Sequence, residues 1–137
     1  MSTARATRGE RGQAMVEFAL VLPLILTLAL AVVLVGEIGI ARVALQHAAA
    51  EGARAAALTN DDALAHAAVA AAVAPLAIGD VSVTIEPTQA QPPRTADPRG
   101  SLVRVHLRYT IPVPLGFAGL AQVTVDGAAA RRMEWSP

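Results

Sequence analysis

The chain is organised around residues 12–36, which read GQAMVEFALVLPLILTLALAVVLVG. From Phe18 to Gly36 there are nineteen consecutive positions without a charged residue, and Glu17 stands directly before them. A helix that spans a membrane needs roughly 20 apolar residues to cross about 30 Å of hydrocarbon. The stretch therefore predicts a membrane-spanning helix with one carboxylate at its entrance, where a charge is costly enough to need a reason.

The charges on the two sides of this stretch predict an orientation. Arg5, Arg8 and Arg11 precede it, whereas no positive charge follows it until Arg42. Arginines close to a membrane span favour the cytoplasmic side. We therefore expect a single-pass protein of the cytoplasmic (inner) membrane, with its amino terminus in the cytoplasm and its carboxyl-terminal part exported.

The spacing of Gly12 and Glu17 resembles a processing site. A cut after Gly12 would make Gln13 the new amino terminus and Glu17 the fifth residue of the mature protein. A short basic leader, a glycine before the cut and a glutamate at the head of an apolar helix resemble the corresponding parts of type IV prepilins and pseudopilins. Residues 46–57, which read QHAAAEGARAAA, also resemble the stretch that follows the membrane helix in the TadE-like family of Tad/Flp pilus systems.

This resemblance implies a function and a set of partners. The chain would be a TadE-like pseudopilin, a minor or accessory subunit in assembly of a Tad/Flp-type type IV pilus, and a prepilin peptidase would cleave it between Gly12 and Gln13. Glu17 and Phe18 would act in assembly, with Glu17 paired to the free amino terminus of a neighbouring subunit. An ammonium in that place would neutralise a carboxylate that is otherwise costly to bury. The implied partners are the membrane, the peptidase and other pilin or pseudopilin subunits of the Tad machinery.

Two other interpretations of the apolar stretch stay open. The stretch could be an uncut signal anchor of an envelope protein with a small binding module unrelated to pili, and Glu17 would then be an interfacial carboxylate. It could also be a secretory signal peptide, because Phe18–Leu28 has the length of an apolar core and Ala29-Leu30-Ala31 has the form of a cleavage site. The run continues past that site to Val35, however, which favours a retained helix. The amino terminus of the mature protein distinguishes the three.

Helical sequence continues beyond the apolar stretch. Residues 37–58 hold no proline and are rich in good helix formers, so we expect one helix from about Gln13 to Leu58, ended by Thr59-Asn60. Small residues recur in it at helical spacing, which predicts close packing on its neighbours. Asn60 or Asp61 can cap a second helix, from Asp62 to about Val73, which Pro75 would end.

The pattern changes to a period of two after Gly79. Three runs alternate apolar and polar residues and predict strands, namely Val81–Glu86, Leu102–Ile111 and about Gln122–Arg131. Residues 87–100 contain four prolines and predict a loop, as do residues 112–120. We expect an antiparallel sheet with one solvated face.

The expected fold class is thus α+β and pilin-like, with a long N-terminal transmembrane helix that continues into a small extracytoplasmic domain with a short helix and a three-stranded antiparallel sheet. The expected parts are a basic leader over residues 1–12, a transmembrane helix over 13–36 and an extracytoplasmic domain over 37–137. Such a small domain must gain stability by packing on the long helix or on neighbouring subunits.

The sequence gives only weak support for a metal site or for a site that binds an anionic partner. His47 and Glu51 are one helical turn apart, but no third ligand accompanies them, and a solvated pair is the better interpretation. Arg104 and Arg108 share one strand face, with Arg131 or Arg132 from the next strand, and could meet an anionic partner, although a solvated sheet face is the default. A net charge of zero gives no support to nucleic-acid binding, and the chain has no cysteine. We expect no enzyme, no cofactor and no metal site.

Overall fold

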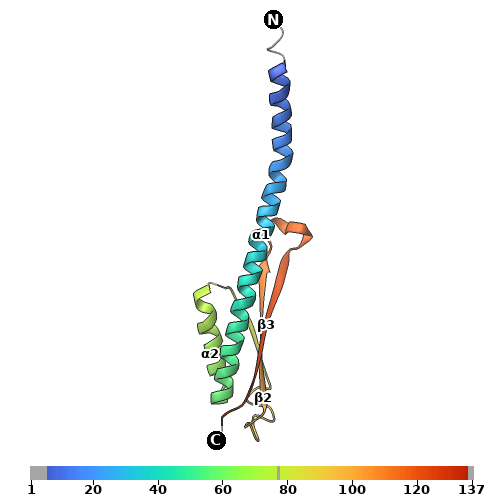
Figure 1. Ribbon diagram of the computed structural model, residues 1–137. Helices are drawn as coiled ribbons and strands as arrows, with labels where there is room; N and C mark the ends of the chain where they lie inside the picture. The colour runs from blue at the N-terminus through green and yellow to red at the C-terminus, as the bar shows by residue number, and fades with distance from the viewer. Residues whose placement is uncertain (1–5, 77, 136–137) are drawn as a thin grey trace. The chain divides into compact units, whose positions relative to one another are not determined.

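The computed structural model describes residues 6–76 and 78–135. The chain divides into two compact units, Met1–Glu37 and Ile38–Pro137. The elements follow in the order α1 (Ala6–Thr59), α2 (Asp62–Val73), η1 (Ala74–Leu76), β1 (Ser82–Glu86), β2 (Leu102–Pro112), η2 (Pro114–Gly119) and β3 (Gln122–Arg132) (Figure 1). The predicted α+β fold is confirmed.

Helix α1 begins at Ala6, seven residues before the expected start, because no proline interrupts residues 6–12 and alanine and arginine favour helix. Pro23 lies inside the helix. The helix ends at Thr59 as expected, and Asn60 follows with a φ of 51°. Asparagine accepts this left-handed conformation more readily than most residues, so the chain can turn sharply into α2.

The bounds of α2 are those predicted from the sequence. Asp61 is its N-cap, and its carboxylate accepts hydrogen bonds from the backbone N–H groups of Ala63 at 2.7 Å and Leu64 at 3.3 Å. These bonds satisfy two of the donors that a helix start leaves free. The regular helix ends at Val73, two residues before Pro75, and continues as the short 3₁₀ turn η1.

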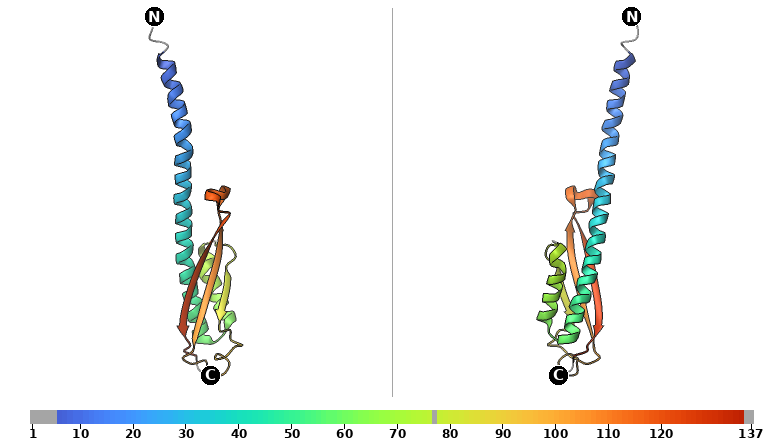
Figure 2. Two further views of the ribbon diagram at one scale, coloured as in Figure 1. Left: turned by 90° about the vertical axis from the view of Figure 1, so that its right-hand side faces the viewer. Right: turned by 60° about the vertical axis from the view of Figure 1, so that its left-hand side comes forward.

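The sheet has the order β1-β2-β3, with both pairs antiparallel. Helix α2 and the part of α1 that belongs to the second unit lie against one face of the sheet (Figure 1, Figure 2). On β2, alternate side chains face the helices and are buried, namely Val103, Val105, Leu107 and Ile111. The polar residues between them are exposed, which confirms the predicted solvated face.

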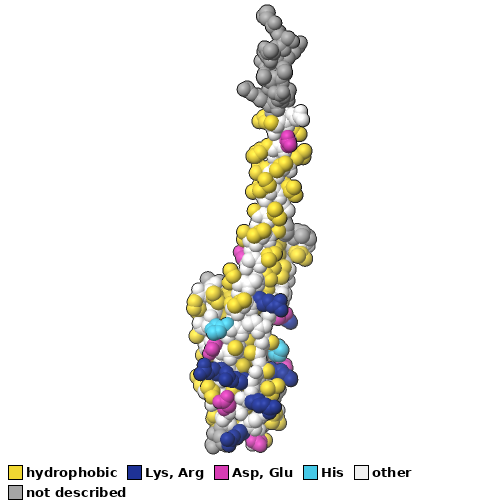
Figure 3. Space-filling model, viewed as in Figure 1, with side chains coloured by type: hydrophobic (Ala, Val, Ile, Leu, Met, Phe, Trp, Pro, Cys, Tyr) yellow, Lys and Arg dark blue, Asp and Glu magenta, His cyan; other side chains and the backbone are white. Residues whose placement is uncertain are grey.

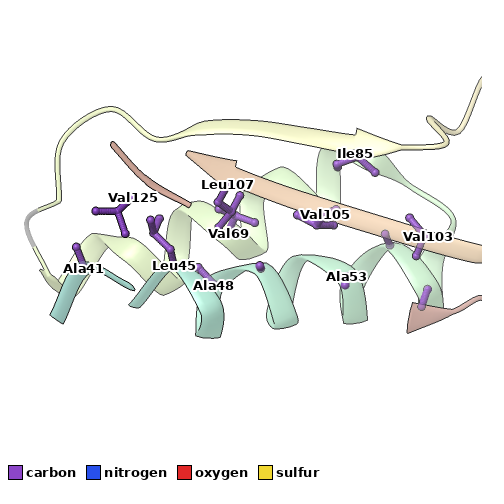
Figure 4. Close-up of a cluster of buried hydrophobic side chains, with 14 of the residues drawn as sticks. Ala41, Leu45, Ala48, Ala53, Val69, Ile85, Val103, Val105, Leu107 and Val125 are labelled. Atoms are coloured by element: carbon purple, nitrogen blue, oxygen red, sulfur yellow. The ribbon is translucent and has the colours of Figure 1, made fainter. Parts of the chain in front are cut away.

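The core of the second unit lies between this sheet face and the two helices (Figure 4). From α1 it takes mainly alanines, together with Leu45, which is fully buried. From α2 it takes Ala65 and Val69, and from the sheet branched aliphatic residues, namely Ile85, Val103, Val105, Leu107, Ile111 and Val125. Because α1 residues 41–57 supply seven of the sixteen buried core residues, the long helix is part of the structure of the small domain, as its small size led us to expect.

Candidate functional site

The four residues expected at a processing and assembly site lie together on α1. Gly12, Gln13, Glu17 and Phe18 are helical and exposed, with Phe18 at 65%. Gln13 and Glu17 are i,i+4 neighbours, so they share one face of the helix, about 6 Å apart along its axis. A new amino terminus at residue 13 would therefore lie on the same side as the Glu17 carboxylate.

Packing within the chain does not explain the glycine at position 12. A Cβ atom built there would meet no atom within 4 Å. A glycine inside a helix costs up to about 1 kcal/mol relative to alanine, but Gly36 and Gly39 are equally open helical glycines, so open space alone does not assign a role to Gly12.

Parts of the predicted leader lie outside the described residues. These are residues 1–5, with Arg5, and the side chains of Arg8 and Arg11. Among the side chains that are described, Glu17 has no ion-pair partner. The sequence interpretation places the cation for Glu17 on a neighbouring subunit.

The first unit exposes most of its large apolar side chains. In the face shown in Figure 3, hydrophobic side chains cover most of its described part, whereas most of the charged side chains that are coloured lie on the second unit. Within residues 12–76 and 78–135, one helix is long and apolar enough to cross a membrane by length and composition, and little of its apolar window is buried. Apolar surface exposed on this scale is unusual in a water-soluble protein and suits a lipid environment.

Residues 46–57, the second stretch that carried the family resemblance, are a packing surface. Ala48, Ala49, Ala56 and Ala57 are fully buried. A Cβ at Gly52 would lie 2.6 Å from Val69 Cγ2 and 3.5 Å from Val105 Cγ1. The small residues therefore let α2 and the sheet approach α1 closely, and this stretch shapes the domain.

A buried arginine, which the sequence interpretation missed, fixes the loop after β1. Arg94 is 1% exposed. Its Nη1 donates to Asp62 Oδ1 and, at 2.8 Å, to the carbonyl oxygen of Pro87, and its Nε donates to Asn60 Oδ1 at 2.9 Å. The arginine thus joins the loop to the corner between α1 and α2.

Further bonds surround this corner. Asp62 and Gln89 exchange two hydrogen bonds through their backbone N–H groups and side-chain oxygens. The backbone N–H groups of Glu134 and Trp135 both donate to the carbonyl oxygen of Ala57 near the end of α1. Arg94 Nη2 is buried without a hydrogen-bond partner among the described residues. No local pattern marks Arg94, because its partners lie up to 34 residues away.

Replacing Arg94 with methionine should destabilise the second unit by about 3 kcal/mol, because removal of one partner strands the other charge of a buried pair. Asp62 keeps 20% of its side-chain surface in water. The loss of stability should therefore lie at the lower end of the range for breaking a buried ion pair. Arg99→Met is the matched control, since Arg99 is an exposed residue of the same loop. Urea midpoints of the full chain in detergent would compare them, and equal midpoints would contradict the assignment.

The solvated sheet face carries the arginines noted in the sequence. Arg108 donates from Nε to Asp126 on β3 at 2.8 Å, and the hydrogen bond and the charge of that carboxylate raise the pKa of Arg108 above its usual value. The register pairs Leu102 with Arg132 and Val103 with Arg131. Arg132, not Arg131, is therefore on the same sheet face as Arg104 and Arg108.

The histidines do not form a metal site with the other described residues. His47, His66 and His106 are exposed, and no group of three or more His, Asp or Glu side chains that could hold a metal ion occurs in the described part of the chain. No hydrogen bond joins His47 to Glu51 among the described contacts.

These features define an α+β chain with one long apolar N-terminal helix of the kind that a single membrane span requires. The family model described as TadE-like protein matches residues 12–54. The match confirms the resemblance to that family and points to a protein associated with a Tad-type pilus. It covers the Gly12 to Phe18 segment, the apolar run and residues 46–54, and ends before α2 and the sheet. No curated protein and no solved structure matches the chain.

Proposed function

We propose that the chain is a TadE-like pseudopilin, a minor or accessory subunit that acts in assembly of a Tad/Flp-type type IV pilus. The observation that carries this proposal is the position of Gly12 and Glu17 at the head of the apolar run, inside the segment that matches the TadE-like family. Gly12 is exposed, which is compatible with access of a prepilin peptidase to this place.

The proposal divides the chain into three parts. Residues 1–12 form a leader that is removed, residues 13–36 hold the mature protein in the cytoplasmic membrane, and residues 37–137 form the exported domain. The arginines before the apolar run support a cytoplasmic amino terminus. A reporter that is active only outside the cytoplasm, fused after Pro137, checks this orientation, and an inactive fusion at normal protein level would reverse it.

The assembly role rests on Glu17. A carboxylate at the head of an apolar helix is unfavourable in lipid unless it is paired, and the proposed partner is the new ammonium group of Gln13 on a neighbouring subunit. Phe18, 65% exposed beside it, would pack on that neighbour. The proposed partners are therefore other pilin or pseudopilin subunits of the Tad machinery.

Replacing Gly12 with leucine should leave the leader on the protein. A side chain at the residue before the cut would obstruct entry of the backbone into a narrow protease cleft, where glycine offers none. Because a Cβ at this position meets nothing within the chain, the variant should fold normally. On a gel of membrane fractions it should migrate with wild-type protein from cells without the peptidase. Gly36→Leu, at an equally open helical glycine, is the control and should be processed. Normal processing of Gly12→Leu would refute the proposed site.

A further inference from the structure

A shallow apolar groove lies on the second unit where α1 meets η1. It has a volume of about 450 Å³ and is lined by Gly39, Ile40, Val43, Ala44, His47 and Leu76. Ile40 is 65%, Val43 72% and Leu76 44% exposed. These are three of the seven large exposed hydrophobic residues in the described part of residues 38–135. Such a concentration of exposed apolar side chains marks a contact surface.

The short segment between the apolar run and the groove limits how far the groove can lie from the membrane. Ile40 follows Gly36, the last residue of the uncharged run, by four positions. Four residues span at most about 14 Å, whatever the angle between the two units. The polar layer on each side of the hydrocarbon core is roughly 5–8 Å thick, and interfacial elements bury apolar groups about 5–10 Å into that boundary. A groove that begins at Ile40 is therefore held within reach of the membrane surface.

The fold adds a second element to the same place. Leu76 follows Ile40 by 36 positions in sequence, yet η1 brings it to the groove. His47 is the polar residue of the lining and lies one helical turn beyond Val43. It is therefore further from the apolar run than the apolar lining residues of α1, as expected where a surface passes from lipid to water. The boundary between lipid headgroups and acyl chains takes up apolar side chains without a complementary surface of defined shape.

We propose that this groove rests on the outer surface of the membrane, with Ile40, Val43 and Leu76 at the boundary between lipid headgroups and acyl chains. Leu76 then anchors the exported domain at a second point and limits how far it can tilt away from the bilayer. The inference rests on the proposed single span with an exported domain, and adds a lipid surface to the partners of that domain.

The absence of cysteine from the chain makes the test direct. Full-length Leu76→Cys is labelled with a polarity-sensitive fluorophore and reconstituted in phosphatidylcholine vesicles, with or without lipids that carry a quencher near the headgroup. Leu64→Cys is the matched control, because it is a leucine of similar exposure on α2, twelve residues and about 18 Å of helix away. Val33→Cys, inside the apolar run, is the membrane standard, quenched by lipids labelled deep in the acyl chain.

We expect headgroup quenching of the Leu76 label to be severalfold stronger than that of the Leu64 label. Equal quenching of the two, with both open to an aqueous quencher, would overturn the inference while the Val33 result leaves the membrane span intact. A Leu76 label shielded from lipid and water alike, together with disulfide cross-links between copies of the unlabelled Leu76→Cys protein, would show that a second copy covers the groove, and would also overturn it. A Val33 label without lipid quenching would remove the proposed span, and this inference with it.

Discussion

Replacing Glu17 with alanine should leave the protein processed and inserted but should greatly reduce or abolish piliation. An alanine suits the bilayer better than a carboxylate, so neither cleavage nor insertion should suffer. Assembly should fail because the ammonium group of a neighbouring Gln13 loses its partner. A pair at the membrane edge is partly desolvated, and its loss costs more than the roughly 1 kcal/mol or less of an exposed surface pair. The measurement is pilus yield at matched protein level in the membrane.

Two further variants separate charge from other effects. Glu17→Gln keeps the size and hydrogen bonding of the side chain and should fail in the same way. Glu37→Ala removes the carboxylate at the other end of the uncharged run, where no amino terminus is expected, and should assemble normally. Normal piliation with Glu17→Ala would show that the carboxylate has no assembly role, and this result would favour the interpretation of the apolar run as an uncut signal anchor.

Replacing Gly127 with alanine should lower the free energy of unfolding of the second unit by about 3 kcal/mol or more, which is the upper range for overpacking. A Cβ there would lie 2.6 Å from the backbone carbonyl carbon of Leu45 and 2.8 Å from its oxygen, whereas carbon atoms pack best at about 3.5–4.0 Å. Since the obstacle is helix backbone, no side-chain rotation relieves the contact. Strand β3 and helix α1 would have to separate, and the loss is a large part of the stability of a small domain.

Two other glycines give a graded control for this prediction. At Gly52 the nearest atom is a side-chain methyl group of Val69, at 2.6 Å, so Gly52→Ala should cost less than Gly127→Ala. At Gly79 the nearest atom is Tyr109 Cε2 at 3.6 Å, an ordinary contact, and Gly79→Ala should be close to wild type. The single tryptophan, Trp135, bonds through its backbone to the end of α1 and can report unfolding in urea. A different order of midpoints would contradict the packing described for β3.

The elements that the sequence predicted are those with local causes. The start of α2 follows from the Asp61 cap and its end from Pro75, and the strands follow from alternation along Leu102–Pro112. What the sequence did not predict depends on contacts between distant segments. Arg94 is buried because Asn60, Asp62 and Pro87 surround it. Leu76 completes an apolar groove because η1 returns to α1.

The candidate site also has features that local sequence predicts and features that depend on contacts between distant segments. Gly12, Gln13, Glu17 and Phe18 could be proposed from the sequence because they resemble the processing site of type IV prepilins, and all four lie within two turns of one helix. Their proposed chemistry involves a peptidase and a neighbouring subunit, so no contact inside the chain identifies them. The role of Gly127 was not predictable in this way, because its close approach to Leu45 joins β3 to α1 across 82 positions of sequence.

The amino terminus of the mature protein tests the central claim most directly. The protein is purified from the membranes of cells with an active prepilin peptidase, and its first residues are determined by sequencing and intact mass. We predict a chain that begins Gln13-Ala14-Met15, with Glu17 as its fifth residue. A chain that begins at Met1 would identify an uncut anchor, and one that begins at Val32 would identify a secretory signal peptide. Either result would contradict the proposed pseudopilin.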